Sequence, residues 1–156
     1  MKEIKQYLKE LNIGFKTFSH PPLYTCEQAQ IYNKDIRGIH CKNLFLKNKK
    51  TTNYYLIIIP ADEKLNLKEF ESLLNEKLTF ANEKELKNIL NLTAGAVSPF
   101  GLINDKDNKT ILIIKKQIWN SDFVSFHPNI NTETLELTGK DFQKYVKSLN
   151  NKLLVI

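Results

Sequence analysis

An uninterrupted apolar segment, Tyr-Tyr-Leu-Ile-Ile-Ile at residues 54–59, most constrains how this chain can fold. A run of this length, rich in β-branched residues, predicts a central strand with both faces buried. Residues 41–46 predict a second strand, and Lys47–Lys50 between the two predict the tip of a hairpin. The chain must therefore build a sheet around residues 54–59 and cover it on both sides.

Helically spaced apolar residues and N-cap residues predict five helices. They occupy residues 2–12, Thr25 to about Asn33, and the segments after Asn66, Asn82 and Gly139, with Gln28, Glu69 and Glu85 completing three capping boxes. Shorter strands are predicted at residues 15–18, 110–114, 124–126 and 134–137. Because strands and helices interleave irregularly, the pattern predicts an α/β protein of the α+β type, with a mixed sheet and helices packed outside it.

Length and composition limit the functional classes. The 156 residues predict one domain, 1–156, and the net charge of +6 moderately favours a polyanionic partner. Arg37 is the only arginine, so lysines would supply phosphate contacts and little base reading. Cys26 and Cys41 have no metal-site or redox spacing, and no phosphate-binding glycine motif occurs, so no cofactor is expected. The sequence has no signal peptide or membrane span, which predicts a cytoplasmic protein, and we expect a monomer.

The segment 93–105 gathers small residues, Gly95, Gly101 and Pro99 between two apolar stretches. Glycine permits positive φ, and proline fixes its own φ and restricts the residue before it. Such a bend leaves backbone N–H groups that can hold a carbonyl oxygen, a phosphate or a water. The alternative is a tight turn that only links a helix to a strand.

Lys42 and His127 are the two side chains whose positions favour a site. Strand alternation places Lys42 on one face with Leu44 and Leu46, so its ammonium group either reaches water at the sheet edge or meets an anionic or carbonyl partner in a pocket. His127 lies where a strand gives way to Pro128-Asn129, a position typical of site residues and also of structural histidines that bond a carbonyl. His20 precedes Pro21-Pro22 in a similar way, and no histidine pair has metal-site spacing.

The residues indicate no protein nucleophile. Ser98 lacks the Gly-x-Ser-x-Gly pattern, and neither Cys26 nor Cys41 has an identifiable histidine partner. A catalyst without a nucleophile would position water against an already reactive bond, and an aminoacyl ester meets that description.

Five segments carry a resemblance to a known family. They are Thr25–Ala29, Lys42–Leu46, Pro60–Asp62, Gly95–Asp105 and Phe126–Asn129, and they occur in the family's order. On these segments the chain resembles the YbaK/ProX family of trans-editing domains, and is most similar to the free-standing ProXp-ala/PrdX type related to the insertion domain of bacterial prolyl-tRNA synthetase. The resemblance extends from about Phe15 to Leu149.

The resemblance implies the largely antiparallel, curved sheet of these editing domains, and hydrolysis of mischarged alanyl-tRNA(Pro). It implies catalytic roles for Lys42, Gly95, Ala96 and His127, and substrate-binding roles for Thr25, Asn43, Leu44, Val97, Ser98, Pro99 and Asn129. It implies that the protein needs no cofactor and no metal. It also implies mischarged tRNA(Pro), and with it prolyl-tRNA synthetase, as partners. Editing would be needed because a pocket built for proline rejects a side chain with missing methylenes by only about 1–3 kcal/mol.

Three alternatives stay open at this point. Relatives with different pocket walls edit other mischarged tRNAs, such as cysteinyl-tRNA(Pro). The same scaffold could also serve as a non-catalytic tRNA-binding module, or as a small-molecule binding or regulatory protein.

Overall fold

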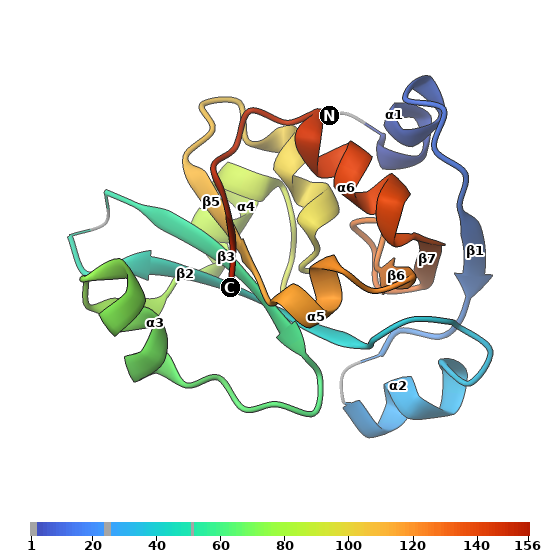
Figure 1. The fold of residues 1–156 in the computed structure, drawn as a ribbon, viewed down its shortest axis with the longest axis horizontal. Coiled ribbons are helices and arrows are strands. Elements are labelled where there is room, and N and C mark those ends of the chain that lie inside the picture. The colour runs from blue at the N-terminus through green and yellow to red at the C-terminus, as the bar shows by residue number, and fades with distance from the viewer. Residues whose placement is uncertain (1–2, 24–25, 51) are drawn as a thin grey trace.

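The computed structural model describes residues 3–23, 26–50 and 52–156, which form two sheets with helices around them (Figure 1). The strands are β1 (Lys16–Ser19), β2 (Cys41–Asn48), β3 (Tyr54–Pro60), β4 (Leu78–Phe80), β5 (Thr110–Ile114), β6 (Phe123–Phe126), β7 (Glu133–Thr138) and β8 (Leu153–Val155). The helices are α1 (Ile4–Glu10), α2 (Cys26–Tyr32), α3 (Leu67–Leu74), α4 (Glu83–Leu90), the 3₁₀ helix η1 (Pro99–Asn104), α5 (Lys116–Trp119) and α6 (Gly139–Lys147).

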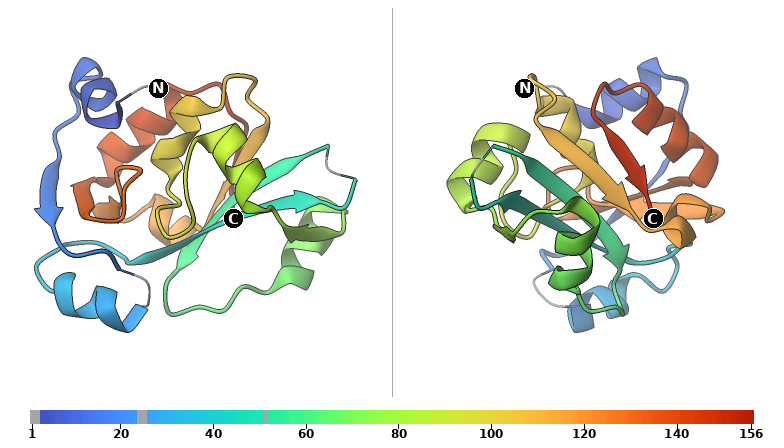
Figure 2. Two further views of the ribbon diagram at one scale, coloured as in Figure 1. Left: turned by 180° about the vertical axis from the view of Figure 1, so that it is seen from behind. Right: turned by 60° about the vertical axis from the view of Figure 1, so that its left-hand side comes forward.

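Strand β3 is the central strand that the apolar run predicts. The larger sheet has the order β4-β2-β3-β5-β8, in which β2 is antiparallel to β3 and β5 is parallel to it. Alternate residues of β3 enter two cores: Leu56 and Ile58 pack with α4, η1 and α6, whereas Ile57 and Ile59 pack with Phe70 of α3. Figures 1 and 2 show α3 on one side of β2 and β3, and α4 and α6 on the other.

The smaller sheet has the order β1-β7-β6 and is antiparallel throughout. Helix α6 follows β7 directly, and its predicted inward residues Phe142, Tyr145 and Val146 are buried. The mixed α/β architecture predicted from the sequence is therefore confirmed, with the strands divided between two sheets.

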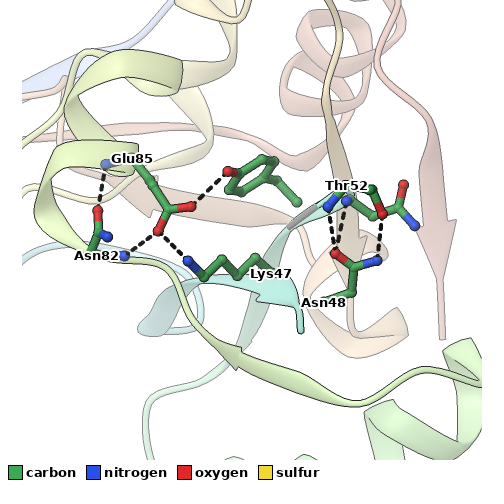
Figure 3. Close-up of polar contacts among 7 residues, drawn as sticks. Lys47, Asn48, Thr52, Asn82 and Glu85 are labelled. Atoms are coloured by element: carbon green, nitrogen blue, oxygen red, sulfur yellow. Dashed lines mark hydrogen bonds and ion pairs between the residues drawn. The ribbon is translucent and has the colours of Figure 1, made fainter. Parts of the chain in front are cut away.

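A polar network explains why β2 runs longer than predicted. Lys47 and Asn48 belong to the strand and not to the hairpin tip, because Lys47 Nζ pairs with Glu85 at 2.7 Å and Asn48 Oδ1 accepts from the main-chain N–H groups of Thr52 and Asn53 (Figure 3). Glu85 also completes the predicted capping box with Asn82. The turn is thus tied to β2 by a side chain that sequence patterns assign to the turn itself.

Several other details differ from the prediction. The short elements β4, α5 and β8 were not expected. Leu73, assigned to the inward face of α3, is 51% exposed. The predicted N-cap Thr25 lies outside the described residues, although α2 begins directly after it.

Candidate active site

A cavity of about 710 Å³ opens where the two sheets meet. Its walls are Leu23, helix α2 with the loop after it, the first half of β2, the turn after β3, Gly95, and the adjoining ends of β6 and β7. This volume lies in the range of about 300–1,000 Å³ typical of ligand sites. Apolar walls with a few converging polar groups make it the candidate active site.

The edge of β2 forms one wall. Strand β4 pairs with β2 at Leu46–Asn48, beyond the segment that lines the cavity. The four consecutive residues Cys41–Leu44 all border the cavity, as expected where a strand edge is exposed and not one face alone. This wall brings Lys42, Asn43 and Leu44 to the site together.

Lys42 lies in the pocket, which is one of the two positions left open by strand alternation. Its Nζ donates a hydrogen bond of 2.8 Å to the main-chain oxygen of Glu63, and within the described chain no carboxylate forms an ion pair with it. The carbonyl takes one hydrogen of the ammonium group and leaves the other two for a substrate oxygen.

Two asparagine oxygens at this wall lack donors. Oδ1 of Asn43 and Oδ1 of Asn33, which also lines the cavity, are buried without a hydrogen-bond partner. Unsatisfied buried acceptors are costly, so a bound donor or a rotation of either amide would stabilise this wall.

His127 is a neutral acceptor in another part of the cavity lining. Its Nδ1 lies 2.8 Å from the main-chain oxygen of Glu133, which can only accept, so Nδ1 carries the hydrogen and Nε2 has the free lone pair. Burial lowers the pKa of His127, the bond to Glu133 raises it, and the nearby charge of His20 lowers it again; the net shift is downward. The imidazole is therefore neutral at pH 7 and can accept a hydrogen at Nε2.

His20 and Thr134 form a second polar pair beside it. The rings of His20 and His127 lie 5.7 Å apart, His20 Nε2 lies 2.8 Å from Thr134 Oγ1, and His20 Nδ1 lies 2.9 Å from the main-chain oxygen of Pro21. The Pro21 oxygen can only accept, so His20 Nδ1 carries a hydrogen, and His20 Nε2 forms its hydrogen bond with the Thr134 hydroxyl. Both residues are buried, and Thr134 reaches the cavity wall. The sequence analysis noted His20 only for its likeness to His127 and did not indicate Thr134.

The glycine-containing loop contributes Gly95, whose φ of +88° allows the turn closed by Ala96 N–H to the Thr93 oxygen at 3.1 Å. Ser98 is fully buried and its Oγ accepts from Phe100 N–H at 3.1 Å, capping η1. The carbonyl of Pro99 accepts from the Tyr145 hydroxyl at 2.8 Å. These bonds fix the loop from inside.

The structure brings five of the predicted site residues together around the cavity: Lys42, Asn43, Leu44, Gly95 and His127. Among the described residues, Ala96, Val97, Ser98, Pro99 and Asn129 are not part of the cavity lining. Asn129 instead donates to the Phe100 oxygen at 3.4 Å, and its Oδ1 is buried without a partner. Thr25 lies outside the described residues. The roles of these residues toward substrate stay predictions.

Cys41 borders the cavity but is not a nucleophile. Burial raises the pKa of its thiol to about 12, and Sγ donates to the Ile39 oxygen at 3.2 Å. A protonated thiol is inert as a nucleophile.

Two negative observations apply to the described part of the chain. Over residues 3–23, 26–50 and 52–156, no three His, Cys, Asp or Glu side chains gather as a metal site. In the same ranges, no helix is both long and apolar enough to cross a bilayer.

The class of protein follows from comparison with known sequences. The family model for the aminoacyl-tRNA editing domain matches residues 20–145. The chain is 35% identical over 150 residues to the "Prolyl-tRNA editing protein ProX" of Acetoanaerobium sticklandii, covering 96% of this chain and 92% of that protein. It is 31% identical over 158 residues to "Prolyl-tRNA synthetase associated domain-containing protein 1" of Mus musculus, covering 99% and 94%.

Solved structures agree with this fold. A candidate trans-editing enzyme for prolyl tRNA synthetase superposes with a TM-score of 0.73 at 16% identity, covering 98% of this chain and 93% of that one. Hypothetical protein APE2540 superposes with a TM-score of 0.76 at 15% identity, covering 99% and 98%. The chain belongs to the aminoacyl-tRNA editing domain family. It is a deacylase of the prolyl-tRNA-related, trans-editing kind, as its resemblance to the YbaK/ProX family implied.

Proposed function

We propose that this protein hydrolyses alanyl-tRNA(Pro), releasing alanine from tRNA that prolyl-tRNA synthetase has mischarged. The observation that carries the proposal is that one cavity is lined by a lysine that has no carboxylate partner among the described residues and by a neutral histidine with an acceptor nitrogen. Lysine suits the ester and phosphate oxygens of an aminoacyl-adenosine end, and the histidine suits a hydroxyl or water hydrogen.

Water is the nucleophile in this proposal. Lys42 orients the ester carbonyl, and its charge stabilises the oxyanion as water adds to the carbonyl carbon. His127 Nε2 accepts a hydrogen bond from the attacking water or from the neighbouring ribose hydroxyl. The bond between the carbonyl carbon and the ribose oxygen then breaks, the ribose oxygen takes a proton, and alanine and free tRNA leave.

Selectivity for alanine would come from the apolar part of the wall. Leu23, Ile39, Leu44 and Phe126 border the cavity. Such a wall admits a methyl group and obstructs the proline ring, so correctly charged tRNA would be spared while the smaller error is removed. Cysteinyl-tRNA(Pro) is the second candidate substrate, because its side chain exceeds alanine by one sulfur atom.

The proposal is tested by deacylation time courses with tRNA(Pro) charged separately with alanine, cysteine, serine and proline. Lys42→Ala should reduce alanine release by at least about 10²-fold, the size of effect seen when one oxyanion donor is removed. Lys106→Ala is the matched control, since Lys106 is exposed in a distant turn.

Preference for another amino acid would keep the mechanism and change the substrate. Full activity in a folded Lys42→Ala protein would refute the role of Lys42. If wild type binds tRNA with salt-sensitive affinity and releases no amino acid, the chain is a binding module and the deacylase proposal fails.

A further inference from the structure

The wall at Leu23 depends on a side chain far away in the sequence. Strands β1 and β7 pair in an antiparallel ladder that ends at Ser19 opposite Glu133. One more main-chain bond follows, from His20 N–H to the Thr132 oxygen at 3.0 Å. Pro21 and Pro22 then have no N–H groups, so the main-chain ladder cannot continue through them.

The side chain of Asn131 makes the next hydrogen bonds beyond the end of the main-chain ladder. Its Nδ2 donates to the Leu23 oxygen at 2.7 Å, and its Oδ1 accepts from Leu23 N–H at 3.2 Å. One carboxamide thus satisfies both main-chain groups of Leu23, as a peptide unit of a neighbouring strand would. Only asparagine and glutamine carry a donor and an acceptor side by side at the end of the side chain.

This contact joins three walls of the cavity. Leu23 lines the cavity and is 8% exposed. Gly95 lies against the same amide, because a Cβ on Gly95 would stand 3.4 Å from Asn131 Nδ2. Asn131 itself belongs to the loop between β6 and β7, which begins at His127. A shift of the Asn131 amide would therefore move the Leu23 wall relative to both the glycine-containing loop and the histidine.

We infer that Asn131 is a positioning residue that sets the width of the cavity at Leu23, and through it the size of aminoacyl group that the cavity admits. The inference rests on the proposed deacylase function. Asn131 touches no reacting atom in this scheme; it acts through Leu23.

The test uses the full chain with Asn131→Ala and Asn131→Asp. Alanine removes both bonds, whereas aspartate keeps the acceptor for Leu23 N–H and sets an oxygen against the Leu23 oxygen. Asn150→Ala is the matched control, since Asn150 is exposed near the C-terminus. Ratios of kcat/KM are measured for tRNA(Pro) charged with alanine, serine, cysteine and proline.

Both Asn131 variants should lower the preference for alanine over the larger residues by about tenfold, the lower end of what one methylene of pocket fit provides. The pH profile of the alanine reaction should not move in Asn131→Ala, because that variant neither adds nor removes a titrating group. Leu23→Ala should reduce the preference by itself, and adding Asn131→Ala to it should change the ratio less than twofold, because the two residues act in series.

Amide hydrogen exchange supplies a readout that does not depend on activity. Leu23 N–H should be protected in wild type and in Asn150→Ala, and should lose that protection in Asn131→Ala while the amides of β3 keep theirs. Unchanged Leu23 protection, an unchanged selectivity ratio, or additive effects with Leu23→Ala would each overturn the inference. Lack of any hydrolysis by wild type would instead overturn the proposed function, and the exchange result would still show whether the Leu23 contact exists.

Discussion

Replacing Arg37 by alanine should lower the free energy of unfolding by about 2 kcal/mol at pH 7. Arg37 Nε and Nη2 lie 3.0 and 2.8 Å from Glu136 Oε1, and Arg37 N–H donates to Oε2 at 2.7 Å. The carboxylate is 2% exposed and the arginine side chain 61% exposed. This contact fastens the loop between α2 and β2, whose residues Gly38, Ile39 and His40 line the cavity, to β7.

The magnitude follows from how far solvent reaches the pair. An exposed ion pair contributes about 0–1 kcal/mol, and breaking a buried one costs about 3–5 kcal/mol. This pair lies between those limits, because one partner is solvated and the variant keeps the main-chain donor. The guanidinium also stacks 3.8 Å from the centroid of the Phe123 ring, a contact worth about 0.5–1 kcal/mol at an exposed site.

The stabilisation should also depend on pH. Burial raises the pKa of Glu136, but the hydrogen bonds and charge of Arg37, with the charge of Lys16, outweigh burial and hold that pKa below its ordinary value. Since the folded pKa lies below the unfolded value of about 4.3, the contribution is present above that pH and is lost as the pH falls through the folded pKa.

Urea denaturation followed by the fluorescence of Trp119, the only tryptophan, measures both effects. Arg37→Lys should lower the free energy of unfolding by less, about 1 kcal/mol, because lysine keeps the positive charge but lacks the planar guanidinium group. Lys34→Ala, in the same loop and exposed, should change stability by less than about 0.5 kcal/mol. A loss in Arg37→Ala below about 0.5 kcal/mol, or one that does not shrink as the pH falls below 4, would refute the reasoning.

Three further predictions concern the cavity. Because the pKa of His127 is lowered below 6.5, kcat/KM corrected for spontaneous hydrolysis should be flat near pH 7 and fall at more acidic pH. His127→Gln should abolish this fall in kcat/KM. If the fall is unchanged in the variant, it belongs to the titration of another group. The folded state should likewise lose stability as the pH falls through this range, since the unfolded chain binds the proton more readily. Thr134→Val should slow hydrolysis at most about tenfold if water attacks; a loss of about 10³-fold, together with an acyl-Thr134 adduct in quenched wild type, would establish a covalent route.

The sequence predicted the parts of the fold that have local signals. The apolar run identified β3, and the Asn82–Glu85 pair identified the start of α4. Strands β4 and β8 have three residues each, which is too few for an alternating apolar and polar pattern to be recognised in the sequence. Leu73 matches the helical spacing of buried residues, but the sequence of α3 alone does not show how much of the helix surface the sheet covers.

For the site, the order of family segments predicted that Lys42, Gly95 and His127 come together, although strand alternation alone left Lys42 undecided. No local pattern distinguishes a loop serine that faces substrate from one that faces inward, and Ser98 faces inward. The Asn131–Leu23 contact joins residues 108 positions apart, and Arg37–Glu136 joins residues 99 apart. Asparagine in a loop and arginine before glycine are too common to indicate such contacts, which appear only once the chain is folded.

When water attacks a reactive ester, the rate depends less on shifted side-chain pKa values than on how precisely the ester and the water are positioned. The groups that reach the cavity are accordingly ordinary: an ammonium on a carbonyl, a neutral imidazole and main-chain atoms at Gly95. The walls around these groups depend on loops that are held by a few polar contacts, at Arg37–Glu136, Asn131–Leu23 and Tyr145–Pro99. Loosening such a contact leaves each reacting group in place but widens what the cavity accepts. Damage to these contacts should therefore appear as lost selectivity between aminoacyl groups before it appears as lost rate, whereas damage at Lys42 should lower the rate for every substrate alike.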